Sequence, residues 1–197
     1  MKLLLFVDVH GDVSALARLK QLSNKVDLVV CAGDISQMEH NLSELLNELN
    51  EFHVPVLIIH GNHEDAEGLK EACSVFKNLI FLHKGAHHFY KYVFLGYGGG
   101  GFAQTDQEFK QVAEKFFLNE LKGKEKVILI VHAPPYKTKL DKIGGEYRGN
   151  KSVREFIDNV QPTLVVCGHL HENAGKEDKL GKTFIINPGK KGVIVDV

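Results

Sequence analysis

The chain has 197 residues, of which 44% are hydrophobic and 25% are charged, a composition typical of a soluble globular protein. Its 24 Lys and Arg residues nearly balance its 25 Asp and Glu residues, for a formal net charge of -1. No overall attraction to nucleic acid or to an anionic membrane surface is therefore expected. The length suits one well-buried unit, and we expect a single domain over residues 1–197.

The cysteines and the N-terminus indicate a cytoplasmic protein. The three cysteines show no CxxC spacing, and Cys31 and Cys167 lie within apolar runs, which is typical of buried thiols in a reducing compartment. The apolar N-terminal run is too short for a signal peptide and is interrupted by Asp8. No apolar run reaches the length needed to span a bilayer, so no membrane association is expected.

The first half of the chain alternates apolar runs with amphipathic segments. Near-continuous apolar runs predict strands of a parallel sheet at residues 3–9, 27–32 and 54–59. Leucines at helical spacing and the segment after the third run predict helices at residues 13–22, 42–49 and 64–73. Asp12 or Ser14 is expected to cap the first helix. This order predicts right-handed crossovers and a largely parallel sheet.

The pattern changes in the second half. Residues 79–82 and 89–95 predict an antiparallel pair or meander, joined by a loop that contains His87 and His88. Helices are then expected at 107–121 and 153–160, the latter with Asn150 or Ser152 near its cap, and apolar strands at 127–131 and 163–167. Short strands follow from about 182 to 197, around the turn signal Asn187-Pro188-Gly189. Two sheets packed together, with helices outside, are the expected arrangement.

Five short clusters of polar side chains follow strand-like stretches. They are Asp8-Val9-His10, Gly33-Asp34, Gly61-Asn62-His63-Glu64, His132, and Gly168-His169-Leu170-His171. Parallel strands place their carboxyl ends along one edge of a sheet, so clusters far apart in sequence can meet in one pocket. The mixture of carboxylate, amide and imidazole suits a pair of divalent metals better than one structural zinc.

Each cluster alone also has an ordinary structural interpretation. An Asp after a strand is commonly a turn or helix-capping residue, and a Glu in a first helical turn is favoured by the helix dipole. An isolated histidine is more often a surface residue than a ligand. The joint occurrence of all five clusters at strand ends favours metal binding.

In this order, the motifs D-x-H, G-D, G-N-H-E, a strand-end His and G-H-x-H resemble the calcineurin-like metallophosphoesterase superfamily. The motifs run from Asp8 to His171 and so cover nearly the whole chain. The segment from His132-Ala133-Pro134-Pro135 through Arg148-Gly149 to residues 168–172 also resembles a branch of small, stand-alone phosphodiesterase-like proteins. The resemblance implies an α/β fold, a four-layer α/β/β/α sandwich with two mixed sheets.

The resemblance further implies two divalent metal ions that share one carboxylate, Asp34. One ion would be held by Asp8, His10, Asp34 and His171. The other would be held by Asp34, Asn62, His132 and His169. Mn²⁺ is the first candidate, and Fe, Ni, Zn or Mg are alternatives because mixed nitrogen and oxygen ligands accept all of them.

The implied reaction is hydrolysis of a phosphodiester by a metal-bridging hydroxide. His63 would assist the leaving oxygen as a general acid or transition-state stabiliser, and His10 joins it in the catalytic set. Glu64 is expected either to orient His63 or to begin a helix. Arg148 is expected either to grip a phosphate oxygen or to be an ordinary loop arginine.

One departure narrows the substrate. The protein Ser/Thr phosphatase branch carries G-D-x-x-D-R-G, whereas residues 33–39 read GDISQME, without the second Asp and the Arg. This departure argues against that branch, and the resemblance to phosphodiesterase-like proteins implies a small phosphodiester as the substrate. A phosphomonoesterase acting on a nucleotide or sugar phosphate, and a non-catalytic scaffold that retains the fold, are the alternatives. A nucleic-acid partner is not expected, and a homo-oligomer remains open.

Overall fold

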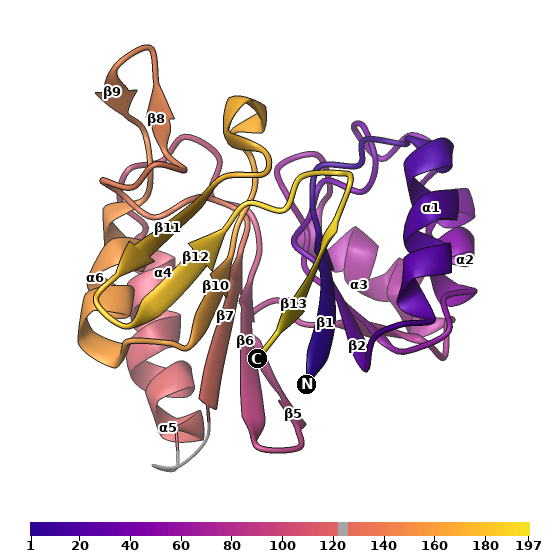
Figure 1. Cartoon of the computed structure of the whole chain (residues 1–197), viewed down its shortest axis with the longest axis horizontal. Helices are drawn as coiled ribbons and strands as arrows, with labels where there is room; N and C mark the ends of the chain where they lie inside the picture. Colours follow the sequence, from indigo (N-terminus) through magenta and orange to yellow (C-terminus); the bar gives the residue numbers. More distant parts are fainter. Residues whose placement is uncertain (122–125) are drawn as a thin grey trace.

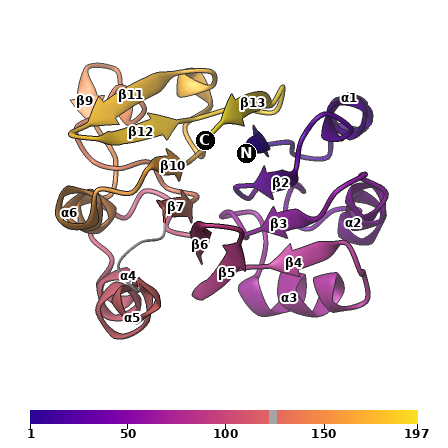
Figure 2. The same ribbon diagram turned by 60° about the horizontal axis from the view of Figure 1, so that its bottom comes forward.

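The structure, a computed structural model that describes residues 1–121 and 126–197, contains two main sheets packed face to face (Figures 1 and 2). The strands of the first sheet are β1 (Lys2–Phe6), β2 (Leu28–Cys31), β3 (Val56–Ile58), β4 (Leu79–Phe81) and β13 (Val193–Asp196). They lie in the order β13-β1-β2-β3-β4. β1 to β4 are parallel, and β13 runs antiparallel to β1.

The second sheet has six strands in the order β11-β12-β10-β7-β6-β5. They are β5 (Gly85–Phe89), β6 (Tyr92–Tyr97), β7 (Lys126–Val131), β10 (Leu164–Val166), β11 (Glu177–Leu180) and β12 (Thr183–Ile186). The four inner strands are mutually parallel, and the two edge strands are antiparallel to their neighbours. A small hairpin, β8 (Lys142–Ile143) with β9 (Glu146–Tyr147), stands apart from both sheets.

Helices cover the outer face of each sheet (Figure 2). The first sheet is covered by α1 (Val13–Ser23), α2 (Leu42–Asn50) and α3 (Ala66–Ser74). The second is covered by α4 (Gln107–Val112), a π-helical turn (Ala113–Phe117), α5 (Leu118–Glu120) and α6 (Lys151–Val160). The predicted four-layer α/β/β/α sandwich with two mixed sheets is confirmed.

Strand alternation in β1 explains how one apolar run serves two layers. Leu4 and Phe6 pack toward the helices of the first sheet, whereas Leu3 and Leu5 pack between the two sheets. All four side chains are fully buried. Successive residues of a strand point to opposite faces, so a strand covered on both sides must be apolar throughout.

Helix starts follow the predicted capping chemistry. The Asp12 carboxylate accepts the Ala15 N–H at 3.0 Å and begins α1. Asn150 accepts the N–H groups of Ser152 and Val153 and begins α6. Side-chain acceptors at this position satisfy backbone donors that the helix itself cannot pair. None of the helices in residues 1–121 and 126–197 has the length and apolar character needed to cross a membrane.

Two details of the predicted elements are wrong. Residues 79–82 and 89–95 do not pair with each other, because β4 joins the first sheet beside β3 and β6 pairs with β5. His87 and His88 lie in β5, not in a loop. An edge strand has one unpaired side and tolerates polar residues, so its apolar pattern is weak. The short turn at Tyr90, which has a positive φ of 53°, closes the hairpin.

Candidate metal centre

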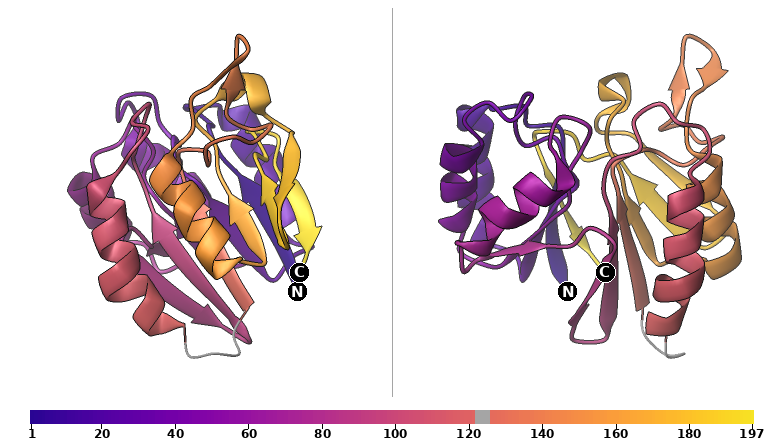
Figure 3. Two further views of the ribbon diagram at one scale, coloured as in Figure 1. Left: turned by 90° about the vertical axis from the view of Figure 1, so that its left-hand side faces the viewer. Right: turned by 180° about the vertical axis from the view of Figure 1, so that it is seen from behind.

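All five polar clusters lie at one edge of the sandwich, where the parallel strands of both sheets end (Figure 1). The clusters follow β1, β2 and β3 in one sheet and β7 and β10 in the other. The β8–β9 hairpin projects from the same end of the molecule (Figure 3). The topology therefore brings together residues from Asp8 to His171, as the strand-end pattern predicts.

Three glycine positions allow the strand ends to approach closely. A Cβ on Gly33 would lie 2.6 Å from the Gly61 nitrogen, and a Cβ on Gly61 would lie 1.9 Å from Asp34 Oδ1. Gly168 is equally confined, because its Cβ would lie 2.2 Å from a Val7 methyl. These contacts exclude any side chain and set the spacing between the loops that carry the candidate ligands.

The first candidate ligand group joins Asp8, His10 and His171. The Nε2 atoms of His10 and His171 are 3.0 Å apart, and His171 Nε2 lies 3.9 Å from Asp8 Oδ1. One ligand atom from each of the three residues falls within 4.8 Å of the others. A cation between these atoms would face one carboxylate and two imidazoles, a donor set that divalent transition metals accept.

The second group contains Asn62, His132 and His169. Asn62 Oδ1 lies 3.1 Å from His132 Nε2 and 2.7 Å from His169 Nδ1. Asp34 lies between the two groups, because its Oδ2 is 3.8 Å from His10 Nε2 and 3.2 Å from His132 Nε2. The structure thus brings together all seven predicted ligands, with Asp34 in the shared position.

Hydrogen bonds around the centre leave ligand atoms free for a cation. His10 Nδ1 faces the Ser36 carbonyl at 3.3 Å, and His132 Nδ1 faces the Ala32 carbonyl at 2.9 Å. In its neutral form with the proton on Nδ1, each ring satisfies its carbonyl and directs an Nε2 lone pair into the site, which is the form that binds a cation. Asp8 Oδ2 is buried without a hydrogen-bond partner in the described chain. An unpaired buried carboxylate oxygen is costly, and a cation would satisfy it.

Burial and mutual contact shift the pKa values of the group. Burial raises the pKa of the Asp8 carboxyl and lowers the pKa of His169 to about 4. Burial also acts to raise the pKa of Asp34, but in the absence of metal the hydrogen bond and charge of protonated His132, with the His63 N–H, outweigh burial and lower that pKa to about 2. At neutral pH, Asp34 is ionised and His169 is neutral, which is the protonation state that a metal ligand requires.

Backbone conformation marks the same residues. Asp8, His10, Asp34 and His169 have positive φ values of 58°, 48°, 52° and 68°. A side chain other than glycine is uncommon in this region and is usually held there by its surroundings. Four of the seven candidate ligands share this feature, which directs their side chains away from the path of the strands and into the centre.

Glu64 does not orient His63 and does not begin a helix, so both expectations for it are wrong. Its buried carboxylate accepts the N–H groups of Asp34, Ser36 and Gly61 at 3.1, 2.9 and 2.9 Å, and the Ser36 hydroxyl at 2.8 Å. Helix α3 begins later, with Asp65 as its cap. One carboxylate therefore binds the loop after β2 to the loop after β3.

His63 stands beside the first ligand group. Its backbone N–H donates to Asp34 Oδ1 at 3.0 Å, and the centroid of its ring lies 4.7 Å from that of His10. His63 Nδ1 accepts the N–H of Met38 at 3.4 Å. A neutral His63 therefore carries its proton on Nε2, because Nδ1 must present a lone pair to Met38.

Arg148 lies outside the ligand groups and is half exposed, with its guanidinium paired to the carboxylate of Glu146. Together with Phe102, Gln104 and Ile143 it lines a cavity of about 440 Å³. The ring of Phe102 contacts the ring of His169 at 4.5 Å between centroids, so this cavity adjoins the candidate centre. The role of Arg148 toward a phosphate stays a prediction.

Several residues that shape the centre lack a signal in the sequence. The carbonyls of Ala32 and Ser36 hold the rings of His132 and His10, and the Met38 N–H holds His63. Backbone groups act here, so residue identity carries little information about them. Phe102 follows a glycine run that is typical of a plain turn, and only the folded chain shows its contact with His169.

A family model described as calcineurin-like phosphoesterase matches residues 1–173. The chain belongs to this family. An uncharacterized protein of Methanocaldococcus jannaschii, MJ1162, is 28% identical, and the match covers 99% of this chain and 91% of that protein. Family members are phosphoester hydrolases that typically bind divalent metals, and Asp8, His10, Asp34, His132 and His171 form groups that could hold a metal ion.

Solved structures share the fold at low sequence identity. TT1561 of Thermus thermophilus matches with a TM-score of 0.75 and 20% identity, over 96% of this chain and 90% of that one. A structure described as a dimetal phosphatase from Danio rerio matches with a TM-score of 0.65 and 14% identity, over 94% and 86% of the two chains. Identities this low support the shared fold and no more.

Replacement of the buried carboxylate tests the arrangement around Glu64. Glu64→Gln retains the shape but offers one acceptor oxygen and an NH₂ group toward several N–H donors, which leaves buried donors unpaired. We expect the free energy of unfolding to fall by about 1–3 kcal/mol, measured by urea denaturation of chelator-treated protein. Glu71→Gln on the exposed face of α3 is the matched control. Equal stability of Glu64→Gln and wild type would contradict the proposed tie between the two loops.

Proposed function

We propose that the protein is a two-metal phosphodiesterase that hydrolyses small diesters. The observation that carries this proposal is the place of Asp34 Oδ2, within 3.8 Å of His10 Nε2 and 3.2 Å of His132 Nε2, between two ligand groups of different composition. A shared carboxylate between two such groups is the arrangement that a dinuclear site requires. A protein described as a dimetal phosphatase has the same fold, so the fold is compatible with such a site.

Seven of the chain's residues provide the donors for the two proposed metal positions. Asp8, His10, Asp34 and His171 would hold one divalent ion, and Asp34, Asn62, His132 and His169 the other. Bound there, two divalent ions supply Lewis acidity and a water of lowered pKa, which makes a nucleophile available near neutral pH. Mn²⁺ is the proposed ion, because Asp8, Asp34 and Asn62 supply the oxygen donors that suit it, while the imidazoles also accept Fe, Ni or Zn.

His63 would serve the leaving oxygen. With Nδ1 occupied by the Met38 N–H, its Nε2 holds the proton that a departing alkoxide needs. The Asp34 carboxylate accepts the His63 N–H and so fixes the position of this residue relative to the ligands. The ring of His10 contacts the ring of His63 edge-on and so restricts movement of the His63 ring on that side.

A diester is preferred over a monoester on two grounds. Cavities adjoin the centre on the His10 side and on the Phe102 side, which leaves room for both alcohol groups of a diester. A third cavity lies beside His171. Among the described residues, the lysines and arginines that line the three cavities are Arg148 and Lys190. Arg148 is already paired with Glu146, and Lys190 with Asp12. A phosphomonoester dianion would lack the extra positive partners that it requires.

Metal dependence and substrate class can be tested together. Chelator-treated protein should be inactive on bis-p-nitrophenyl phosphate and should recover activity with Mn²⁺, with a higher kcat/KM than on p-nitrophenyl phosphate. Faster monoester hydrolysis would favour the phosphomonoesterase alternative. Absence of activity on both esters across Mn, Fe, Ni, Zn and Mg would favour a scaffold, and activity without metal would contradict the mechanism.

Substitution of His63 tests its assignment. His63→Ala should lower kcat for the diester by about a hundredfold or more, a loss in the range expected for a general acid, while the metal content per chain is retained. Asn62→Ala should reduce both activity and metal content, because it removes a ligand. His88→Ala, an exposed histidine on β5, is the control and should match wild type. Wild-type turnover by His63→Ala would remove that residue from the reaction.

A further inference from the structure

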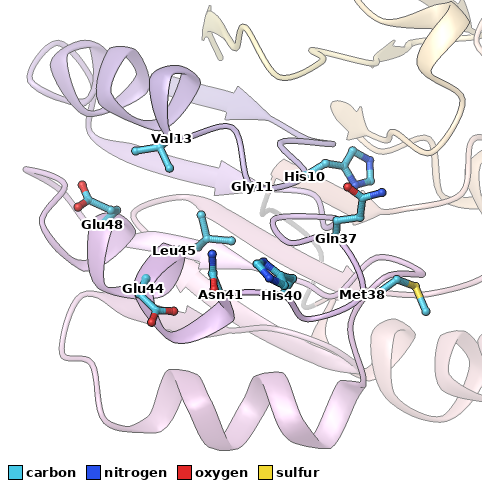
Figure 4. Close-up of a pocket in the computed structure, with 10 residues that line it drawn as sticks. All are labelled: His10, Gly11, Val13, Gln37, Met38, His40, Asn41, Glu44, Leu45 and Glu48. Atoms are coloured by element: carbon cyan, nitrogen blue, oxygen red, sulfur yellow. The ribbon is translucent and has the colours of Figure 1, made fainter.

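A cavity of about 520 Å³ opens beside His10, between the start of α1 and helix α2 (Figure 4). Its wall near the candidate centre comes from His10 and Gly11 and from the loop after β2. Its far wall comes from α2 and the residue before it. The lining residues are His10, Gly11, Val13, Gln37, Met38, His40, Asn41, Glu44, Leu45 and Glu48. This volume lies in the range of small-molecule sites.

The cavity adjoins the residue proposed to serve the leaving group. Met38, one of its wall residues, donates its backbone N–H to His63 Nδ1. His10, another wall residue, contacts the His63 ring at 4.7 Å between centroids. An alcohol that leaves phosphorus on the His63 side would therefore face this space.

Part of the lining is apolar. Val13 and Met38 are 59% and 74% exposed, unusually high for apolar side chains, and Leu45 forms a buried part of the wall. Apolar surface beside a polar centre suits the hydrocarbon part of a small ligand.

The charged part of the lining is negative, with no lysine or arginine. The carboxylates of Glu44 and Glu48 form no hydrogen bond or ion pair with any described residue. Lys20 of α1 lies near Glu48, but its raised pKa comes mainly from its hydrogen bond to Glu51, with which it forms its ion pair. The sequence has no Lys or Arg between Lys25 and Lys70, the stretch that supplies most of the wall.

The opposite side of the centre has a different character. Among the described residues, the cavity next to Phe102 is lined by Phe102, Gln104, Ile143 and Arg148, with no carboxylate in its lining, and its one cation is paired with Glu146. The lining of the cavity beside His10 contains two glutamates that pair with no described residue, so the two sides of the candidate centre differ in charge, and this difference can orient an asymmetric substrate.

We propose that the cavity beside His10 binds the leaving alcohol and selects an uncharged or cationic alcohol with an apolar part over an anionic one. The apolar part covers Val13, Met38 and Leu45. A carboxylate or second phosphate on the alcohol would face two glutamates without a cation in the lining to match it, which disfavours such substrates. This inference rests on the proposed function and names the substrate class of the same site.

The test compares two methyl aryl phosphodiesters that share the methyl group and differ in the leaving phenol. One phenol carries a trimethylammonium group and the other a carboxylate. Each substrate's intrinsic reactivity is the same for all variants, so the ratio of the two kcat/KM values isolates the effect of the cavity. We expect the ratio of kcat/KM for the cationic substrate to that for the anionic one to be about tenfold lower in the Glu44→Gln/Glu48→Gln variant than in wild type. The variant loses two surface charge contacts, which have a combined effect of this size.

Glu67→Gln/Glu71→Gln is the matched control. It removes the same charge at the same spacing from the exposed surface of α3 and should keep the wild-type ratio. An unchanged ratio in Glu44→Gln/Glu48→Gln, or an equal fall in the control, would overturn the assignment. Wild-type protein that hydrolyses neither diester with any metal would instead overturn the proposed function.

Binding of the free phenols provides a readout that does not need turnover. In Mg²⁺-containing protein, the trimethylammonium phenol should shift the methyl NMR signals of Val13 and Leu45, and 4-hydroxybenzoate should shift them several-fold less at equal concentration. The difference should shrink in Glu44→Gln/Glu48→Gln. No shift with either phenol, or equal shifts in wild type, would show that the cavity does not select the alcohol by charge.

Discussion

The buried carboxylate of Glu64 is the contact on which the candidate centre depends most. It accepts backbone N–H groups from two loops, from Asp34 and Ser36 in the loop after β2 and from Gly61 in the loop after β3. Close glycine contacts between the same loops leave no room for a side chain. Backbone hydrogen bonds and close packing thus hold the Asp34 backbone in place, which limits the positions that its carboxylate can take.

From that point the rest of the centre is built by topology. Asp34 reaches His10 after β1 and His132 after β7, so it contacts histidines that follow strands of opposite sheets of the sandwich. The carbonyls of Ser36 and Ala32 set the orientation of these two rings. The two sheets pack against each other through a shared apolar core, which includes the inward-facing leucines of β1. This packing fixes the relative position of the strand ends that carry the candidate ligands.

Much of this arrangement could be predicted from the sequence, because each cluster follows an apolar run and parallel strands end at one edge. Capping by Asp12 and Asn150 could be predicted as well, since local chemistry determines it. The partners of Glu64 could not, because backbone N–H groups leave no trace in residue identity. Edge strands such as β5 and β11 also escape prediction, since their polar residues mask the strand pattern. The cavity beside His10 depends on the approach of α1 and α2, which no local pattern encodes.

The most direct measurement of the central claim is anomalous scattering at the Mn absorption edge from crystals of the Mn²⁺-reconstituted protein. The account predicts two peaks about 3.5–4 Å apart, on either side of Asp34 Oδ2, one near His10 and His171 and the other near His132 and His169. A single peak, or peaks away from Asp34, would contradict it.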